Sequence, residues 1–338
     1  MALFVPAYNP TTRSFLRATH AAMRATDRET WTLAVIPDTQ RLAPNNPTAY
    51  NALVQWIVDN KTIEDIRMVM HLGDIVNNGA SNTEWTRADA ALSRLHGEVP
   101  WLLTAGNHDY DDDGQGQTYQ RAVTKWDSKF PESDWTGYSW YIDSYNNQTQ
   151  NMAGTLTIGT KKYLFLTLEL YPRAGAVAWA ETIITAQSPD RIILSTHMLV
   201  TDFGLHATDT REDVSASLPQ DYSICDNRAD ADCMNGDDIY ANFISSHSNI
   251  ILTVNGHDLD IDLSGEGYAK REDTVGGNVV NQHFFNYQNL RGSSYQQSAV
   301  LRLYKFNHTN NSCAVTTYNP VTGVSKTDSE NQFTFNFS

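Results

Sequence analysis

The chain has 338 residues, of which 41% are hydrophobic, and it carries 8 Trp, 16 Tyr and 12 Phe. This content can bury a large core, which excludes an intrinsically disordered chain. Asp and Glu outnumber Lys and Arg by 39 to 24, for a formal net charge of −15. The acidic excess disfavours a nucleic-acid-binding face, because such faces are basic. No run of about 18 apolar residues is present, so no membrane span is predicted.

The N-terminal region does not show a basic start followed by an apolar run, so no secretory signal peptide is visible. We treat residues 1–30 as an N-terminal extension and residues 31–338 as a single domain. A soluble, cytoplasmic protein is the default expectation, with exposure on a surface or a virus particle as the alternative. Cys225 and Cys233 could close a small disulfide loop, which would indicate an oxidising compartment. The alternative is three unpaired thiols.

Apolar runs typical of buried strands alternate with amphipathic stretches typical of helices. The predicted order is strand 32–37, helix 48–60, strand 67–72, a helix opened by the capping box Ser81-x-x-Glu84, strand 100–105, a hairpin of 155–158 and 163–170 that turns at Gly159-Thr160, helix 174–186, strand 191–196, helix 237–246, strand 249–254, and strands 282–287, 299–306, 313–318 and 333–337.

The order of these elements predicts an α/β fold of two packed mixed β-sheets flanked by helices, with extra β-strands at the C-terminus. The chemistry-bearing motifs lie within residues 32–260, and residues 280–338 form a β-rich C-terminal part. Residues 201–237 are acidic and have no clear period. We expect them to form a loop insertion, because long connections of this kind often frame a site.

Side chains able to bind metal follow five of the predicted strands. Ligand sites in open α/β sheets form beyond the carboxyl ends of strands. An anionic substrate also needs a local positive source in so acidic a chain, and a metal centre is the usual one. Oxygen and imidazole ligands without thiolates suit Mn, Fe, Zn or Mg. The residues are Asp38 and Gln40, Asp74 and Asn77, Asn107 and His108, His197, and His257.

The motifs around these residues resemble the signature of the calcineurin-like metallophosphoesterases. That signature is D-x-H, G-D-x-x-N/D, G-N-H-D/E, an isolated His and G-H-x-H, in this order. The matching segments are Asp38-Thr39-Gln40, Gly73-Asp74-Ile75-Val76-Asn77, Gly106-Asn107-His108-Asp109, His197 and Gly256-His257. The resemblance covers residues 32–260 and implies two divalent metal ions that activate a water for attack on a phosphate ester.

The resemblance also implies a role for each residue. Asp74 would bridge the two metals, and Asp38 and Gln40 would complete the first site. The second metal would be held by Asn107, His197 and His257. His108 would stand beside the leaving group as proton donor or charge stabiliser, and Asn77 would orient it.

The sequence departs from the family pattern at three positions. Gln40 stands where the family usually has His, and Asn77 stands where some members have Asp. Leu259 replaces the second His of G-H-x-H and cannot bind a metal. We therefore expect a weak first metal site. Asp258 or Asp260 is a candidate replacement ligand, although the alternation of Asp and aliphatic residues over 258–263 also fits a strand with a solvated acidic face.

The acidic stretch from Asp109 to Gly114 matches the opening of a calcium-binding loop. The twelfth position of that loop is Gln120 rather than the usual Glu. A solvated acidic turn is therefore the alternative to a calcium site.

The leading hypothesis is a metal-dependent phosphoesterase that hydrolyses a phosphomonoester or a phosphodiester of small size. The alternative is a catalytically weakened protein of the same fold with a binding or structural role, such as a surface or virus-particle component. Phe333, Phe335 and Phe337, on one face of the last predicted strand, would suit an assembly surface. The sequence specifies neither the substrate nor the oligomeric state.

Overall fold

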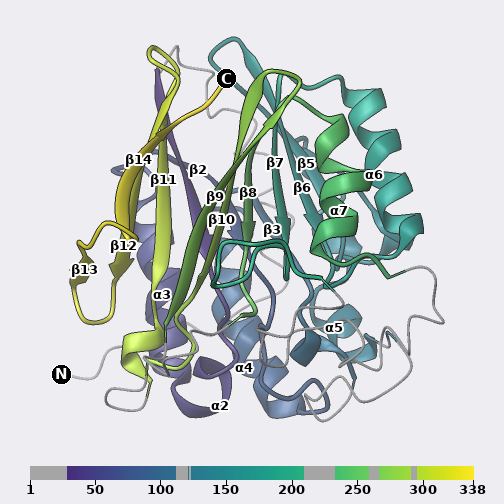
Figure 1. Ribbon diagram of the computed structural model, residues 1–338. Coiled ribbons are helices and arrows are strands. Elements are labelled where there is room, and N and C mark those ends of the chain that lie inside the picture. Colours follow the sequence, from purple (N-terminus) through teal and green to yellow (C-terminus); the bar gives the residue numbers. More distant parts are fainter. Residues whose placement is uncertain (1–28, 112–120, 122, 209–232, 259–265, 291–294) are drawn as a thin grey trace.

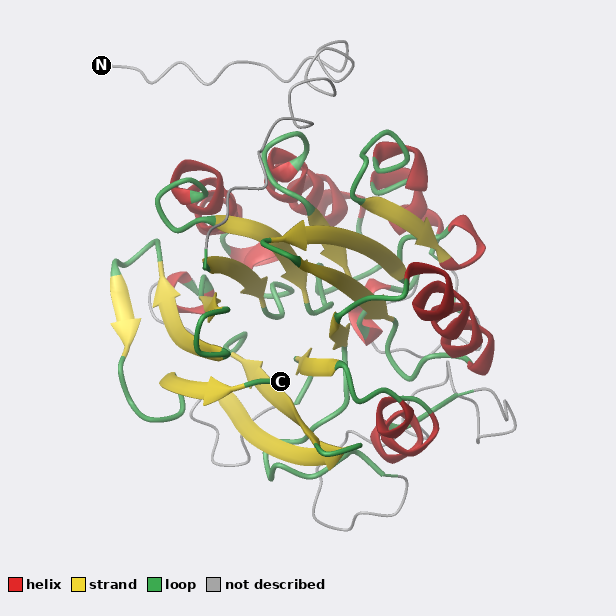
Figure 2. Cartoon of the chain, turned by 90° about the horizontal axis from the view of Figure 1, so that it is seen from above, coloured by secondary structure: helices red, strands yellow, loops and turns green. Residues whose placement is uncertain are grey.

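The computed structural model describes residues 29–111, 121, 123–208, 233–258, 266–290 and 295–338. Within them the strands form two seven-stranded mixed sheets, with helices around the outside (Figures 1 and 2). This architecture confirms the predicted fold class.

The first sheet combines N-terminal and C-terminal strands. Its order is β13-β12-β11-β1-β2-β3, with β14 also paired to β12. The pairs β1–β2 and β2–β3 are parallel, and the C-terminal strands pair antiparallel. The strands are β1 (Thr30–Ile36), β2 (Ile66–His71), β3 (Trp101–Leu103), β11 (Leu301–Asn307), β12 (Ser312–Asn319), β13 (Val324–Lys326) and β14 (Gln332–Asn336).

The second sheet comes from the middle of the chain. Its order is β4-β5-β6-β7-β8-β10-β9. The strands β6, β7, β8 and β10 run parallel, and the outer pairs are antiparallel. The strands are β4 (Tyr141–Ser144), β5 (Met152–Ile158), β6 (Lys161–Leu168), β7 (Arg191–Thr196), β8 (Ile250–Asn255), β9 (Gly267–Val275) and β10 (Asn278–Asn286).

Helices cover the outer faces of both sheets. Residues of α3 and α4 pack with β1 to β3, and residues of α6 and α7 pack with β6 and β7. Ser81 caps α4, because its hydroxyl accepts the N–H of Glu84 at 3.3 Å. The other half of the predicted capping box differs, since the Glu84 carboxylate accepts the N–H groups of Asn77 and Asn78. The helices are α2 (Leu42–Asn45), α3 (Pro47–Asn60), α4 (Asn82–Leu92), α5 (Thr124–Lys129), α6 (Ala174–Gln187) and α7 (Gly236–Asn242).

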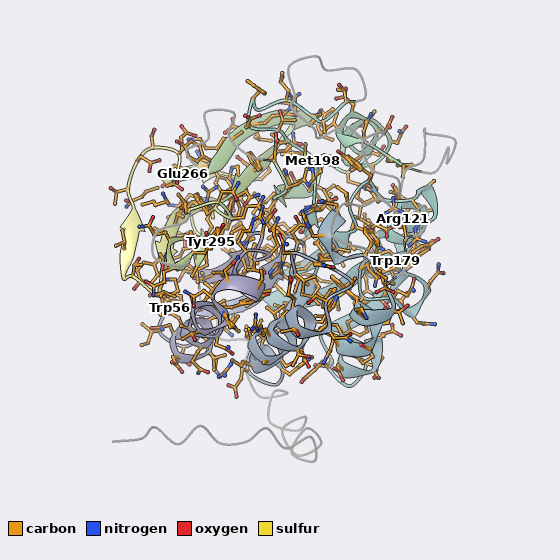
Figure 3. The ribbon with its side chains drawn as sticks, turned by 90° about the horizontal axis from the view of Figure 1, so that it is seen from below. Trp56, Arg121, Trp179, Met198, Glu266 and Tyr295 are labelled. Carbon is orange, nitrogen blue, oxygen red and sulfur yellow. The ribbon has the colours of Figure 1, made fainter. Side chains whose placement is uncertain are left out.

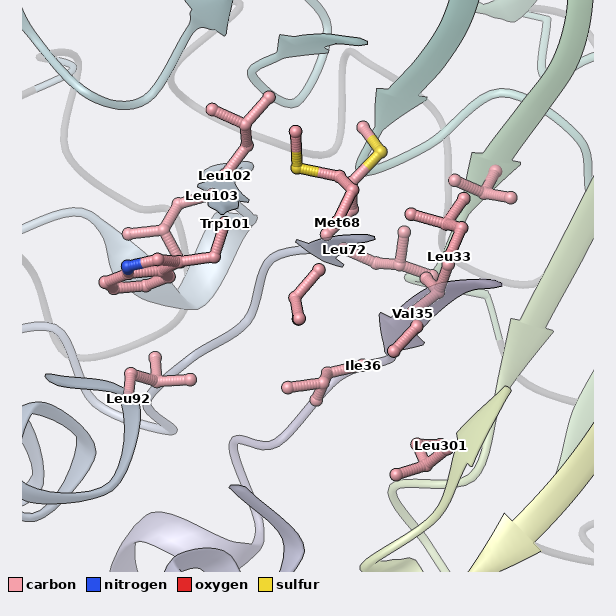
Figure 4. Close-up of a cluster of buried hydrophobic side chains, with 14 of the residues drawn as sticks. Leu33, Val35, Ile36, Met68, Leu72, Leu92, Trp101, Leu102, Leu103 and Leu301 are labelled. Carbon is pink, nitrogen blue, oxygen red and sulfur yellow. The ribbon is translucent and has the colours of Figure 1, made fainter. Parts of the chain in front are cut away.

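The core lies between the two sheets and between the sheets and the helices that cover them. Trp31 of β1 stacks on Phe306 at 4.7 Å between ring centroids and meets the ring of Tyr163 edge-on at 5.0 Å. These contacts join the two sheets, because Tyr163 belongs to β6. Figure 4 shows the part of the core where β1, β2, β3, α4 and β11 meet. Phe335 and Phe337 are also buried, so they belong to the core and not to an assembly surface.

Several expectations need adjustment. The sequence did not predict β4, β9 and β13. The helix expected at 237–246 begins at Gly236 and ends at Asn242. The expected loop insertion at 201–237 lies largely outside the described residues, which resume with Cys233. Cys233 is disulfide-bonded and Cys313 is a free, buried thiol, whereas Cys225 lies outside the described residues.

No helix in the described part of the chain combines the length and the apolar character that crossing a membrane requires.

Candidate metal centre

The predicted ligands meet where strands of both sheets end. Asp38, Asp74 and Asn107 follow β1, β2 and β3 of the first sheet. His197 and His257 follow β7 and β8 of the second sheet. Met198 directly follows His197. Figure 3 shows Met198 from below, with Tyr295 and Glu266 on one side of it and Arg121 and Trp179 on the other. The site therefore depends on the packing of one sheet against the other.

Two glycines allow the ligand loops to approach one another. A Cβ on Gly73, whose φ is +101°, would lie 2.6 Å from Nδ1 of His197. A Cβ on Gly106 would lie 2.2 Å from Oδ1 of Asp74. Asp74 and His257 themselves adopt left-handed conformations with φ of 51° and 75°. Such backbone is unfavourable for these residues, and it is typical of functional sites.

Four side chains converge as the ligands of one ion would. One ligand atom from each of Asp74, His197 and His257 lies within 4.8 Å of the others, and all three residues are buried. Oδ1 of Asn107 lies 3.3 Å from Nε2 of His197 and 3.0 Å from Nδ1 of His257. Nε2 of His197 lies 3.4 Å from Oδ1 of Asp74. Ligands bound to Zn²⁺ at about 2.0–2.2 Å in a tetrahedral site lie about 3.4 Å apart, so these separations fit a shared cation.

The orientation of His197 favours this role. Its Nδ1 lies 2.7 Å from the main-chain oxygen of Leu72 and donates its hydrogen to it. In the neutral imidazole, Nε2 then carries the lone pair and faces the other ligands. A carbonyl that fixes the tautomer of a histidine in this way is a common support for metal ligands.

Gln40 and Asp38 lie beside this cluster, on the side of the predicted first metal. Nε2 of Gln40 donates to Oδ2 of Asp74 at 2.8 Å, which directs the amide. Oε1 of Gln40 is buried and has no hydrogen-bond partner among the described residues. Buried acceptors are rarely left without a partner, so a bound cation would satisfy this atom. Asp38, Gln40 and Asp74 together offer oxygen ligands only, which fits the site that the sequence predicts to be weak.

The buried charges of the site perturb one another. Burial raises the pKa of Asp38 to about 7, and the charge of Asp74 adds to the increase. Burial acts to lower the pKa of His197, but the Asp74 carboxylate outweighs it and raises the pKa to about 9. Burial and the neighbouring His197 lower the pKa of His257 to about 3. A divalent cation would let the carboxylates ionise and the imidazoles stay neutral together.

His108 is oriented through main-chain groups. Its N–H donates to Oδ1 of Asp74 at 3.0 Å, and its Nδ1 lies 2.7 Å from the main-chain oxygen of Asn77. From the sequence, we expect the side-chain amide of Asn77 to hold this imidazole. That amide oxygen instead accepts from Nη1 of Arg41 at 2.9 Å. Sequence reasoning missed Arg41, a half-buried cation whose Nε has no hydrogen-bond partner in the described part of the chain.

Asp109 links the loop after β2 to the loop after β3 through hydrogen bonds. Its Oδ1 accepts the N–H groups of Ile75 and Val76 at 2.8 and 3.2 Å, and its Oδ2 accepts the N–H of Gly106 at 2.9 Å. Asp111 accepts the N–H groups that open α5. Residues 112–114 lie outside the described residues, so the calcium loop stays a prediction.

Of the two candidate replacements for the missing histidine ligand, only Asp258 lies among the described residues. Asp258 is buried, and its Oδ2 accepts the N–H of Asp202 at 3.1 Å. Leu259 and Asp260 lie outside the described residues. The proposal that an aspartate substitutes for the missing ligand therefore stays a prediction.

A sequence model of calcineurin-like phosphoesterases matches residues 32–260 of the chain. The chain belongs to this family. The matched range contains every predicted ligand, and it agrees with the range identified from the motifs. Members of the calcineurin-like phosphoesterase family are metal-dependent phosphoesterases in general, and the cluster of Asp74, His197 and His257 is a candidate metal site of this kind.

Similar proteins agree with this assignment at the level of the fold. The chain is 24% identical over 305 residues to the uncharacterised protein YvnB of Bacillus subtilis (strain 168), covering 87% of this chain and 20% of YvnB. It therefore spans about one fifth of that relative. The purple acid phosphatase PPD1 from yellow lupin (Lupinus luteus) seeds has a TM-score of 0.53 and 14% identity, covering 91% of this chain and 54% of that one. The last likeness shows the fold alone.

Proposed function

We propose that the chain hydrolyses phosphate esters with the help of two divalent cations. The observation that carries this proposal is the convergence of Asn107, His197 and His257 on the Asp74 carboxylate at separations typical of metal ligands. In a chain with a net charge of −15, a metal centre is the usual positive source that attracts an anionic ester.

Each residue would contribute through its own atoms. Asn107, His197 and His257 would hold one ion, Asp38 and Gln40 the other, and Asp74 would serve both. When bound, the ions would polarise the phosphoryl group and lower the pKa of a water molecule. The pair of hydrogen bonds on Asp74, from Gln40 and from the N–H of His108, keeps both carboxylate oxygens directed into the site.

His108 is the proposed proton donor to the leaving group. Its Nδ1 is engaged by the carbonyl of Asn77, so its Nε2 is the atom available for substrate. Arg41 holds the side chain of Asn77, and its positive charge lies on the His108 side of the site. We infer that Arg41 supports the binding of the negatively charged ester.

The two metal sites should differ in affinity. The site at Asn107, His197 and His257 has two imidazoles, which borderline metals such as Zn and Fe prefer. The site at Asp38 and Gln40 has oxygen ligands, which Mg and Mn accept. The purified protein should therefore hold one ion tightly and exchange the other.

The test compares the wild type with Asp74→Asn, using Asp127→Asn as a matched control. The Asp127 carboxylate accepts hydrogen bonds from the side-chain amides of Gln148 and Gln150, and neither residue is a predicted metal ligand. Metal content and turnover of an aryl phosphate monoester and a diester are measured with added Mn²⁺. Asp74→Asn should lose at least one ion and nearly all turnover while its circular dichroism is unchanged, and Asp127→Asn should retain both.

If the Asp74→Asn variant hydrolysed the esters at the rate of the wild type, the two-metal proposal would be contradicted. A folded wild type that binds metal but turns over neither ester would favour the alternative, a catalytically weakened protein with a binding or structural role.

A further inference from the structure

Asn286, the last residue of β10, contacts ligands assigned to both metal sites. Its Nδ2 donates to Oδ2 of Asp38 at 3.0 Å and to the main-chain oxygen of His257 at 3.3 Å. The side chain is completely buried. One amide group from the second sheet thus reaches the proposed first-site ligand Asp38 and the turn that carries the second-site ligand His257.

The orientation of this amide is fixed. Oδ1 of Asn286 accepts the N–H of Gln288 at 2.9 Å, so the oxygen must be on that side. Only the NH₂ group can then face Asp38. Asn286 therefore presents no free oxygen to a metal, and its contribution is to hold other residues in place.

The segment that Asn286 holds has little freedom. The N–H of His257 also donates to Oδ2 of Asp38, at 3.1 Å. A Cβ on Gly256 would lie 2.0 Å from Oδ1 of Asp38, so the carboxylate lies directly against this backbone. His257 adopts φ of 75°, which an L-residue keeps only when its surroundings enforce it. The Asn286 hydrogen bond to the His257 carbonyl is one such enforcing contact.

We propose that Asn286 is a positioning residue that couples the two metal sites. It fixes the Asp38 carboxylate for the first ion and the backbone of His257 for the second. This inference rests on the proposed function, because it assigns Asn286 a part in the same metal centre. It also links the first-site ligand Asp38 to β10 of the second sheet.

The test uses Asn286→Leu, which keeps the number and branching of the side-chain heavy atoms but has no side-chain N–H, and Asn286→Ala. The matched control is Asn281→Leu. Asn281 is equally buried on β10, but its Nδ2 donates to the main-chain oxygens of Ile251 and Asn336, away from the ligands. Mn²⁺ binding is measured by calorimetry on metal-free protein. Thermal unfolding without metal and the Mn²⁺ concentration needed for half-maximal turnover are measured alongside.

Outer contacts that orient metal ligands typically change metal affinity by about 10- to 100-fold when removed. We expect a loss of this size in Asn286→Leu, a matching increase in the Mn²⁺ needed for activation, and recovery of turnover at saturating Mn²⁺. Asn281→Leu should lose stability without losing affinity. Unchanged Mn²⁺ affinity in a folded Asn286→Leu, with a wild type that binds, would overturn this inference alone. A wild type that binds no Mn²⁺ would overturn the proposed function as well.

Discussion

The main-chain N–H of His108 donates to the Asp74 carboxylate, and Nδ1 of its ring lies against the main-chain oxygen of Asn77, so Nε2 is the ring atom that we propose acts on a substrate. Removing the ring should leave the ligands in place, because the N–H that donates to Asp74 is retained. His108→Ala should therefore keep its metal content and lose turnover by about 10²- to 10⁴-fold, the usual range for a general acid.

The dependence on the leaving group separates this role from others. Esters with acidic leaving groups need no proton, so they should suffer less than esters with alkyl leaving groups. Rates for a series of aryl and alkyl phosphates would measure this. An equal loss across the series would contradict the proton-donor role.

Metal affinity should rise with pH. In the metal-free site the pKa of Asp38 is raised to about 7 and that of His197 to about 9. A cation needs the ionised carboxylate and the neutral imidazole, so protons compete with metal below these values. Mn²⁺ titrations between about pH 6 and pH 9 should show affinity increasing across the range, with protons released on binding. Affinity that is flat or falls with pH would contradict this.

The convergence of the proposed ligands could be predicted from sequence because each follows shortly after the end of a buried strand. A strand that ends at the site must deliver its next polar side chains there, which is a local property of the chain. Asn286 could not be found in this way, because it lies inside the predicted strand 282–287 and not after it. Asn286 contacts a residue 248 positions away, and nothing in its own surroundings in the sequence distinguishes it from other asparagines.

At the level of elements, a buried ion network joins the end of β6 to neighbouring segments. The carboxylate of Glu169 is buried and lies 2.7 Å from Nε of Arg173 and 3.4 Å from Nη1 of Arg121. Burial acts to raise the pKa of Glu169, but the two guanidinium groups outweigh it and lower the pKa. Arg121 also donates to the main-chain oxygens of Leu170 and Tyr171.

Removing the negative charge of Glu169 would leave Arg121 and Arg173 without the carboxylate that they share. Loss of one partner from a buried ion pair costs about 3–5 kcal/mol. Glu169→Gln should therefore lower the free energy of unfolding by about 3 kcal/mol or more, as measured by urea denaturation. Glu98→Gln, which breaks the more exposed pair with Lys61, should cost less than about 1 kcal/mol. Equal small losses in both variants would contradict this.

The elements that the sequence did not predict have physical reasons for being missed. β9 (Gly267–Val275) lies at the edge of its sheet and carries Lys270, Arg271, Glu272 and Asp273 in succession. Such a run resembles a solvated loop, although charges on an edge strand are a common protection against pairing with other chains. β13 has three residues, too few for a pattern of two to appear.

At the scale of the whole molecule, the two sheets contribute to one centre from distant parts of the chain. The hydrogen bond between His257 N–H and the Asp38 carboxylate joins residues 219 positions apart. Closing so long a loop is entropically costly, so contacts of this kind tend to form late in folding. The metal ligands can then come together only after both sheets have formed.

Interactions that are absent from the folding transition state slow unfolding and leave the folding rate nearly unchanged. Bound Mn²⁺ should therefore slow unfolding without accelerating folding. In stopped-flow experiments, the refolding rate should be the same with Mn²⁺ and with chelator, and the unfolding rate should be several-fold lower with Mn²⁺. A chain newly made in a metal-poor environment would then reach its fold at the ordinary speed and become long-lived only when the ions arrive.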